Sequence, residues 1–384
     1  MKFGINILMP DPQMKGGATR YRETLELVDL AALVDMDSVW VTEHHFSNYS
    51  LIPSPITLLS AVAQRAPKLR VGTGVLLLPL WNPVRVAADI AALDCLTGGR
   101  VDVGIGRGYQ RVEFEVMGVP IEENRQMMEE SVEALKRLWT EKNTTFAGQY
   151  FNVGRPVTLL PRPVQQPHPP IWVATSSPAS IEYCARGGYG FMQGSVELSI
   201  DKLCERSFYQ QQLWQELGHA LDAYRFLSIR AIMCTPTDAE AEDAVDYLQW
   251  QIRVPVHLIK GDREVVDGAA NADPFDGEPR REDWLERVVF GSPETCIERI
   301  LALDEADITH LNGWFEFGGI PQERALASLK LFGEKVIPVV KRTSEQRRRN
   351  RPTHQPRKPV DKNQALGGAI TESIWGQPEG QRVP

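Results

Sequence analysis

The strongest constraint on the fold is a regular alternation of strand-like and helix-like segments. Eight short apolar runs have the length and composition of buried strands, and segments with helical spacing of apolar residues lie between them. The strand-like runs are Lys2–Leu8, Ser38–Thr42, Lys68–Leu78, Arg100–Ile105, Ile171–Ala174, Gly190–Gln193, Phe226–Cys234 and His310–Phe315. Eight successive βα units predict an α/β fold of the (β/α)8 TIM-barrel type rather than an open sheet.

The expected helices follow the strands in order. They are Tyr21–Val34, Pro55–Ala66, Pro83–Leu96, Arg125–Lys142, Pro178–Gly187, Ile200–Leu217, Asp238–Ile252 and Pro321–Lys335. A short hairpin is expected near residues 146–152, and the proline-dense stretch 156–170 is expected to be an extended connector.

Two segments break the alternation. Residues 254–281 are rich in Gly, Asp, Pro and Asn and precede the eighth strand; they are either an active-site lid or a disordered insertion. The end of the chain is polar and basic, with Arg347-Arg348-Arg349 at its centre, which indicates a disordered tail. The expected division is therefore a barrel over residues 1–341 and a tail over residues 342–384.

Composition narrows the classes of protein that this chain can represent. A net charge of −8 over 384 residues opposes nonspecific attraction to nucleic acid or anionic membranes. The five cysteines are scattered and form no Cys-x-x-Cys pair, so we expect no metal site, no disulfide framework and a reducing cytoplasm. The first residues read as a strand rather than a signal peptide, and no apolar run reaches the length of a membrane span.

A titratable group follows the second strand, in Glu43-His44-His45-Phe46. The C-terminal ends of barrel strands are where active sites form, and an imidazole titrates near neutral pH. Because side chains alternate along a strand, only one of the two histidines should point into the barrel mouth. The alternative is that neighbouring backbone groups satisfy both histidines.

Two glycine-rich segments lie toward the C-terminal ends of the third and fourth strand-like runs. In Gly104-Ile105-Gly106-Arg107-Gly108-Tyr109, tyrosine occupies the place of the third glycine of a dinucleotide fingerprint, so that motif fails. Arg107 either binds phosphate with its guanidinium fork or pairs with a carboxylate in a tight turn. In Gly72-Thr73-Gly74-Val75, glycine permits backbone to approach a flat ligand; the alternative is a strand thinned for packing.

Hydroxyl groups lead into a helix after the fifth strand, in Ala174-Thr175-Ser176-Ser177-Pro178-Ala179-Ser180. A helix N-terminus with such residues can bind phosphate. Capping of the helix by Ser176 or Ser177, with Pro178 in the first turn, explains the same pattern.

Taken together, these segments resemble the bacterial luciferase-like flavin monooxygenase family, close to the luciferase α-subunit branch. The resemblance extends over residues 1–341. Besides the motifs above, it includes Leu78-Pro79, Asn82-Pro83-Val84-Arg85, Gly98-Gly99-Arg100, Gly291-Ser292-Pro293-Glu294-Thr295-Cys296, Leu329-Lys330-Leu331-Phe332 and Val336-Ile337-Pro338.

The resemblance implies a barrel that binds reduced FMN at its C-terminal mouth and activates O2 as a flavin C4a-hydroperoxide. The resemblance implies an FMNH2- and O2-dependent monooxygenase that oxidises a carbonyl or hydroxylates a small organic substrate. A separate flavin reductase is expected to supply the FMNH2, and the protein is expected to form a homodimer. The alternatives are an F420 (deazaflavin)-dependent dehydrogenase on the same barrel and a noncatalytic flavin-binding partner subunit.

The resemblance also assigns roles to residues. His44 is the expected catalytic histidine. Arg107, Ser176 and Ser180 resemble the phosphate clamp, and Gly74-Val75 matches a place where the family often has a nonprolyl cis peptide beneath the isoalloxazine. The expected cofactor-binding set is Gly74, Val75, Arg107, Gly108, Tyr109, Ala174, Thr175, Ser176, Ser177 and Ser180. The aromatic and apolar residues considered for the pocket wall are Trp81, Phe114, Met192, Trp250 and Trp314.

Three positions depart from the luciferase pattern. Gly106 stands where luciferase has a reactive cysteine, Thr175 where it has an acidic residue, and Asn82 where it has a histidine. These changes argue against light emission and a long-chain aldehyde substrate, and they leave reduced-flavin oxygenation intact.

Overall fold

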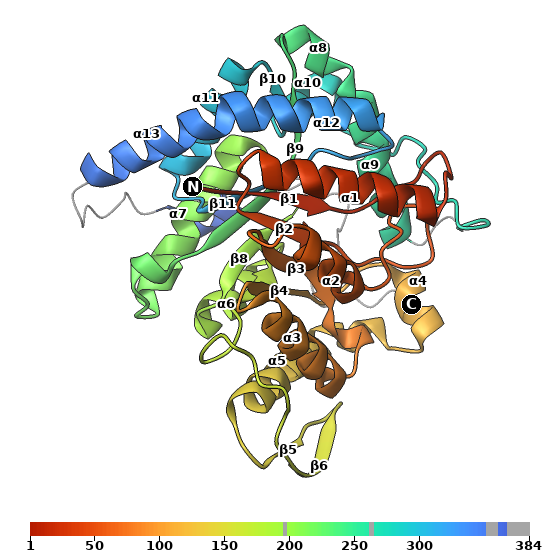
Figure 1. Cartoon of the computed structure of the whole chain (residues 1–384), viewed down its shortest axis with the longest axis vertical. Helices are drawn as coiled ribbons and strands as arrows, with labels where there is room; N and C mark the ends of the chain where they lie inside the picture. The colour runs from red at the N-terminus through yellow and green to blue at the C-terminus, as the bar shows by residue number, and fades with distance from the viewer. Residues whose placement is uncertain (195–197, 261–264, 351–359, 367–384) are drawn as a thin grey trace.

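Eight parallel strands close into a barrel in this computed structural model, which describes residues 1–194, 198–260, 265–350 and 360–366 (Figure 1). Around the ring the strands are β1 (Lys2–Ile7), β2 (Ser38–Val41), β3 (Arg70–Leu77), β4 (Val101–Gly106), β7 (Ile171–Ala174), β8 (Gly190–Gln193), β9 (Phe226–Cys234) and β11 (His310–Trp314). Closure is complete because β9 pairs with both β8 and β11, and β11 pairs with β1. The predicted (β/α)8 barrel is confirmed.

Helices surround this barrel (Figure 1). They are α1 (Gly17–Leu33), α2 (Pro55–Arg65), α3 (Pro83–Thr97), α5 (Asn124–Thr140), α6 (Pro178–Gly187), α7 (Ile200–Glu216), α8 (Asp238–Glu242), α9 (Ala244–Lys260), α11 (Pro293–Glu305), α12 (Gln322–Leu331) and α13 (Ile337–Asn350). Proline begins four of them, where its missing N–H costs nothing. Asn82 caps α3 by accepting hydrogen bonds from the next two available backbone N–H groups.

Large indole rings fill the barrel interior, and glycines make room for them. A Cβ atom on Gly72 would lie 2.5 Å from the ring of Trp40, and one on Gly190 would lie 2.3 Å from the ring of Trp172. These two indoles meet edge to face with centroids 5.5 Å apart. Because the interior is packed, a ligand must bind at the mouth of the barrel rather than within it.

Several elements were not predicted. The helix α4 (Arg111–Met117) follows β4, and α10 (Arg281–Leu285), β10 (Val289–Gly291) and α11 lie between α9 and β11. Strand β10 pairs with the end of β9 outside the ring. Both α4 and α10 are shorter than two turns, too short for a periodic apolar pattern to reveal. The expected hairpin is present as β5 (Thr144–Ala147) and β6 (Asn152–Val157).

The insertion expected over residues 254–281 is partly helical. Helix α9 continues to Lys260 despite Pro255, and residues 261–264 lie outside the described residues. The following loop docks on the segment after β2, because Asn48 N donates to Gly268 O at 2.7 Å and Ala270 N donates to Asn48 Oδ1 at 2.9 Å. That this insertion moves as an active-site lid stays a prediction.

The tail boundary expected at residue 341 falls inside α13, which continues to Asn350. A further short helix, α14 (Lys362–Leu366), packs on α7, where Arg206 Nη2 donates to Leu366 O at 3.2 Å. The rest of the expected tail, 351–359 and 367–384, lies outside the described residues. Within the expected tail, residues 342–350 thus continue helix α13 and residues 362–366 form helix α14.

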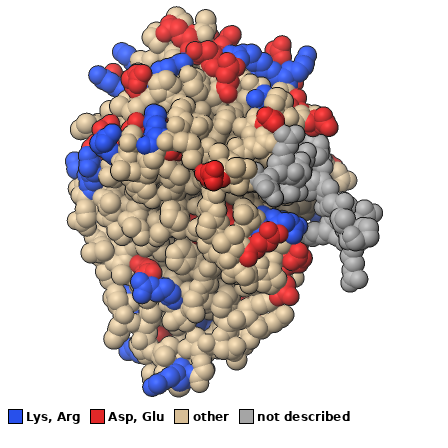
Figure 2. Space-filling view, turned by 90° about the vertical axis from the view of Figure 1, so that its right-hand side faces the viewer, with Lys and Arg blue, Asp and Glu red and all other residues tan. Residues whose placement is uncertain are grey.

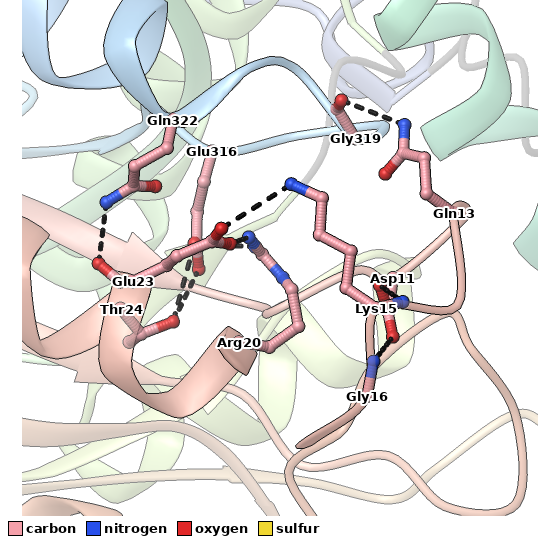
Figure 3. A network of polar contacts seen from close by, with 10 residues as sticks. All are labelled: Asp11, Gln13, Lys15, Gly16, Arg20, Glu23, Thr24, Glu316, Gly319 and Gln322. Atoms are coloured by element: carbon pink, nitrogen blue, oxygen red, sulfur yellow. Dashed lines mark hydrogen bonds and ion pairs between the residues drawn. The ribbon is translucent and has the colours of Figure 1, made fainter. Parts of the chain in front are cut away.

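A polar network ties two loops at the mouth of the barrel (Figure 3). The buried Glu316, just after β11, accepts from Arg20 Nη2 at 2.9 Å and from Thr24 Oγ1 at 3.4 Å. Gln13 Nε2 donates to Gly319 O at 3.0 Å. The loop before α1 and the loop after β11 are thus held together next to the cavity described below.

Candidate functional site

One cavity of about 230 Å³ opens at the C-terminal ends of the strands. Nearly every residue of the predicted site lines it: His44, Gly74, Val75, Arg107, Gly108, Tyr109, Ala174, Thr175, Ser176 and Ser180. Ser177 is the exception. Ser177 caps α6: its Oγ accepts a hydrogen bond from Ser180 N, and its backbone N donates to Ser180 Oγ. This is the alternative that the sequence left open for the segment.

The imidazole of His44 is held at both nitrogen atoms. Nδ1 lies 3.0 Å from Glu113 Oε1 on α4 and 2.9 Å from Gln110 Nε2, while Nε2 lies 3.3 Å from the hydroxyl of Tyr109. A carboxylate only accepts hydrogen bonds, so its pairing with Nδ1 places the proton there. The amide of Gln110 is then turned so that its oxygen, which otherwise has no partner among the described residues, faces Nδ1–H. Nε2 is then the basic nitrogen. Burial raises the pKa of Tyr109 well above its usual value, so this phenol stays protonated and can donate.

The neighbouring carboxylate and imidazole serve the framework instead. Glu43 is fully buried; its Oε2 accepts from Leu77 N at 2.8 Å and its Oε1 accepts from Trp81 Nε1 at 2.9 Å. His45 Nε2 also lies 2.9 Å from Glu43 Oε1. The two histidines therefore divide as strand alternation predicts, and only His44 lines the cavity.

The floor of the cavity is a backbone surface. The peptide bond Gly74–Val75 is cis, as the resemblance predicts. Its Gly74 carbonyl accepts from Thr42 Oγ1 at 2.9 Å, and Thr42 Oγ1 in turn accepts from Asn6 Nδ2 at 3.1 Å. A Cβ on Gly106 would lie only 2.6 Å from Val75 Cγ2, so glycine keeps this floor open.

Cationic and hydroxyl groups gather at the β4–β7 side of the mouth. Arg107 follows β4, Arg125 lies in the first turn of α5, and Ser176 is exposed just before α6. The N-terminal end of α6 adds the positive end of its dipole. Burial raises the pKa of Glu129, one turn along α5, and Arg125 partly offsets that rise. This side can bind an anion such as a phosphate.

The model of the luciferase-like monooxygenase family matches residues 1–310. The chain belongs to this family. A flavin-dependent trigonelline monooxygenase, oxygenase component, from Acinetobacter baylyi is 26% identical over 338 residues, which cover 85% of this chain and 92% of that protein. An F420-dependent glucose-6-phosphate dehydrogenase from Amycolatopsis mediterranei is 27% identical over 333 residues, or 83% and 95% of the two chains.

A solved structure shows the same architecture. Monooxygenase RslO1 from Streptomyces bottropensis superposes with a TM-score of 0.77 at 28% identity, covering 88% of this chain and 99% of that chain. The luciferase-like family thus includes relatives whose names state either flavin or F420 dependence, and the cavity must be compared with both.

Three residues of the candidate site in this luciferase-like barrel were missed by sequence reasoning. Glu113 gave no signal, because it lies in a helix too short to predict. Arg125 offered one, since a cation in the first turn of a helix opposes the helix dipole. Trp284 of α10 also lines the cavity, as do the predicted Met192 and Trp314.

The other aromatic residues considered for the pocket wall lie elsewhere. Trp81 binds Glu43, and the ring of Phe114 packs where a Cβ on Gly108 would lie. Trp250 is half-buried and not part of the cavity wall among the described residues.

Other site types find no support in the described parts of the chain. Within them, no group of three or more His, Cys, Asp or Glu side chains could hold a metal ion. None of the described helices is long and apolar enough to cross a membrane. On the face shown in Figure 2, acidic and basic side chains are interspersed rather than gathered into one basic surface.

Proposed function

We propose that this luciferase-like protein is an FMNH2- and O2-dependent monooxygenase that acts on a small organic substrate. The observation that carries the proposal is the placement of an anion-binding side, a flat backbone floor and a buried imidazole around one cavity. These three parts match the phosphate, the ring and the reacting region of a flavin nucleotide.

The residues present fit FMN. Arg107 and Arg125 supply positive charge for a phosphate, and Gly106 leaves the floor open for a planar ring. Asn6 Oδ1 is buried at this floor with no hydrogen-bond partner among the described residues, so it can accept from a ring N–H. Reduced FMN, when bound, supplies the electrons with which O2 is activated for transfer of an oxygen atom.

Each part of the chain has a role in this proposal. Arg107, Ser176 and the N-terminal end of α6 hold the phosphate. The backbone from Arg107 to Tyr109 and at Ala174 and Thr175 borders the cofactor. The Thr175 hydroxyl itself donates to Met192 O at 3.2 Å, so its side chain supports the wall rather than the ligand.

His44 moves the proton. Its Nε2 accepts a proton from the reacting group, and the Glu113 carboxylate stabilises the imidazolium through Nδ1–H. The protonated phenol of Tyr109 donates to the lone pair of Nε2 in this structure, so it turns away when the reacting group takes its place. Helices α9 and α10 cover the mouth with apolar side chains, which exclude water from the reaction.

We further propose a separate flavin reductase as a transient partner. The sequence has no nicotinamide fingerprint, and the Acinetobacter baylyi relative is named an oxygenase component. A homodimer through α2 and α3 is a second assembly proposal. Val84 and Leu96 on α3 are exposed apolar side chains that such a contact would cover, and light scattering would measure it.

An F420-dependent dehydrogenase is the second candidate, because the Amycolatopsis mediterranei relative is named as one. The two functions differ in cofactor affinity and in oxygen consumption. Titration of the protein with FMN, FMNH2 and F420, followed by mixing of each reduced complex with O2, separates them. Our proposal predicts preferential FMNH2 binding and oxygen consumption; preferential F420 binding with no oxygen consumption would contradict it.

A further inference from the structure

The cavity has a second side, across the barrel from its cations. In the ring of eight strands β11 lies four places from β4, so Trp314 at the end of β11 is opposite Arg107 after β4. A flavin whose phosphate lies at Arg107 and whose ring lies over Gly74–Val75 leaves the β9–β11 side for another molecule. This step rests on the proposed function.

The wall of the β9–β11 side is apolar. It comes from the residue after β1, from the interior of β9, from the C-terminal half of α9, and from two indoles. Its apolar members besides the indoles are Leu8, Ile229, Ile252, Pro255, Val256 and Ile259. Apolar surface of this kind favours a ligand in proportion to the apolar area that the ligand buries, by roughly 25 cal/mol per Å².

Charge is confined to the other side. The charged residues that line the cavity are Glu43, Arg107, Arg125 and Glu129, all from the segment between β2 and α5. Along the wall formed by β1, β9, β11, α9 and α10, the described lining residues carry no charge. A charged substrate would lose its hydration there without gaining a partner among them.

Two residues of this apolar wall carry buried hydrogen-bond donors. Trp284 is fully buried and Trp314 is 6% exposed, and the indole Nε1–H of each has no acceptor among the described residues. Buried donors are nearly always paired in proteins, because an unpaired one costs about 1–3 kcal/mol. Two such donors at one cavity wall indicate a ligand oxygen or nitrogen as their partner.

We propose that the β9–β11 side is the substrate subsite, and that it takes an uncharged, largely apolar molecule with one hydrogen-bond acceptor, of which a ketone is the simplest kind. The indole N–H groups of Trp284 and Trp314 bind the acceptor, and the aliphatic side chains bind the hydrocarbon. Specificity against a charged analogue comes from desolvation, and specificity against a hydrocarbon comes from the two donors.

Three probes of similar size test this subsite: cyclohexanone, methylenecyclohexane and cyclohexanecarboxylate. Protein labelled with ¹⁵N in its tryptophan side chains is titrated with each, both with and without saturating FMN. Trp284→Phe and Trp314→Phe assign the two indole N–H signals and remove one donor each while keeping an aromatic ring. Trp250→Phe is the matched control, because Trp250 does not line the cavity.

We expect cyclohexanone to move both indole proton signals downfield and to bind about five- to tenfold more tightly than methylenecyclohexane. At saturating FMN, which occupies the side with Arg107 and Arg125, cyclohexanecarboxylate should bind more weakly than either. Each of the two cavity variants should lose part of the preference for the ketone while keeping its affinity for the alkene, and Trp250→Phe should keep both.

Equal affinity for ketone and alkene, tighter binding of the carboxylate at saturating FMN, unmoved indole signals, or no binding of any probe at millimolar concentration would overturn the subsite. The FMN titration described under the proposed function tests cofactor binding separately from the subsite. If FMN fails to bind while the ketone preference holds, the proposed function fails and the subsite stands.

Discussion

Nδ1 of His44 lies 3.0 Å from Oε1 of Glu113, and both side chains are buried at the mouth of the barrel. The same carboxylate oxygen accepts from His45 N at 2.9 Å, so Glu113 is itself held in place. This pair sets the proton on Nδ1 and presents Nε2 as the base. Its two members have different roles and can be tested separately.

Replacement of His44 tests the base directly. His44→Ala should lower substrate turnover by about 10²- to 10⁴-fold, the usual contribution of a general acid–base group. FMN affinity should change little, because the phosphate and ring contacts lie on other residues. Stopped-flow turnover and a flavin titration measure the two effects, and unchanged turnover would remove His44 from the base role.

Glu113→Gln tests the positioning role of the carboxylate. The amide keeps the size of the side chain but removes the charge that stabilises the imidazolium, so turnover should fall by up to about 10²-fold. The pH profile of turnover should shift together with this loss, which a purely structural defect would not produce. A variant with wild-type turnover and an unshifted profile would contradict the role.

The phosphate side is tested by comparing two flavins on one variant. Arg107→Ala should weaken FMN binding by about 10- to 100-fold, the value of hydrogen bonds to a charged partner. Riboflavin lacks the phosphate, so its affinity should be nearly unchanged. An equal loss for both flavins would show that Arg107 supports the cavity rather than the phosphate.

Gly106 keeps the floor of the cavity open. In Gly106→Ala the new Cβ would lie 2.6 Å from Val75 Cγ2, which forces Val75 toward the space that the flavin ring needs. FMN affinity should fall, as measured by flavin fluorescence. Gly154→Ala is the matched control, because a Cβ there meets nothing within 4 Å. Equal FMN affinity in the two variants would be inconsistent with this packing.

The polar network around Glu316 makes the free energy of unfolding depend on pH (Figure 3). Burial raises the pKa of Glu316 above its usual 4.5, and Arg20 offsets part of the rise. A carboxyl that holds its proton more tightly in the folded state stabilises the fold at low pH and loses that contribution as pH rises through the folded pKa.

Glu316→Gln cannot titrate. The wild-type free energy of unfolding minus that of the variant should therefore decrease as pH rises from about 4.5 through the raised pKa. Urea unfolding at a series of pH values measures the difference. A difference that grows with pH would contradict the assignment.

Much of the fold could be predicted because its evidence is local and periodic. Largely apolar strands such as the one ending at Leu77 and proline-initiated helices such as the one starting at Pro83 carry their own signals. Short elements do not: α4 carries Glu113, yet its seven residues show no period. Helix α9 also runs past Pro255, where the composition indicated an irregular insertion.

In the candidate site, too, the features with a local sequence signal could be predicted and the others could not. His44 and Arg107 follow the ends of β2 and β4, and Gly74–Val75 lies in the C-terminal half of β3, the part of a barrel where position alone predicts function. Trp284 and the pairing of His44 with Glu113 depend on side chains far apart in the sequence that meet only in the folded structure. Ser177 was assigned to the cofactor because capping and phosphate binding favour the same residues at a helix start.

The crystal structure of this protein grown with FMN tests the central claim most directly. We predict one FMN at the barrel mouth, with its phosphate hydrogen-bonded to Arg107, its ring against Gly74–Val75 and its reactive edge facing Nε2 of His44. A flavin bound elsewhere, or one whose phosphate lies away from Arg107, would contradict the account.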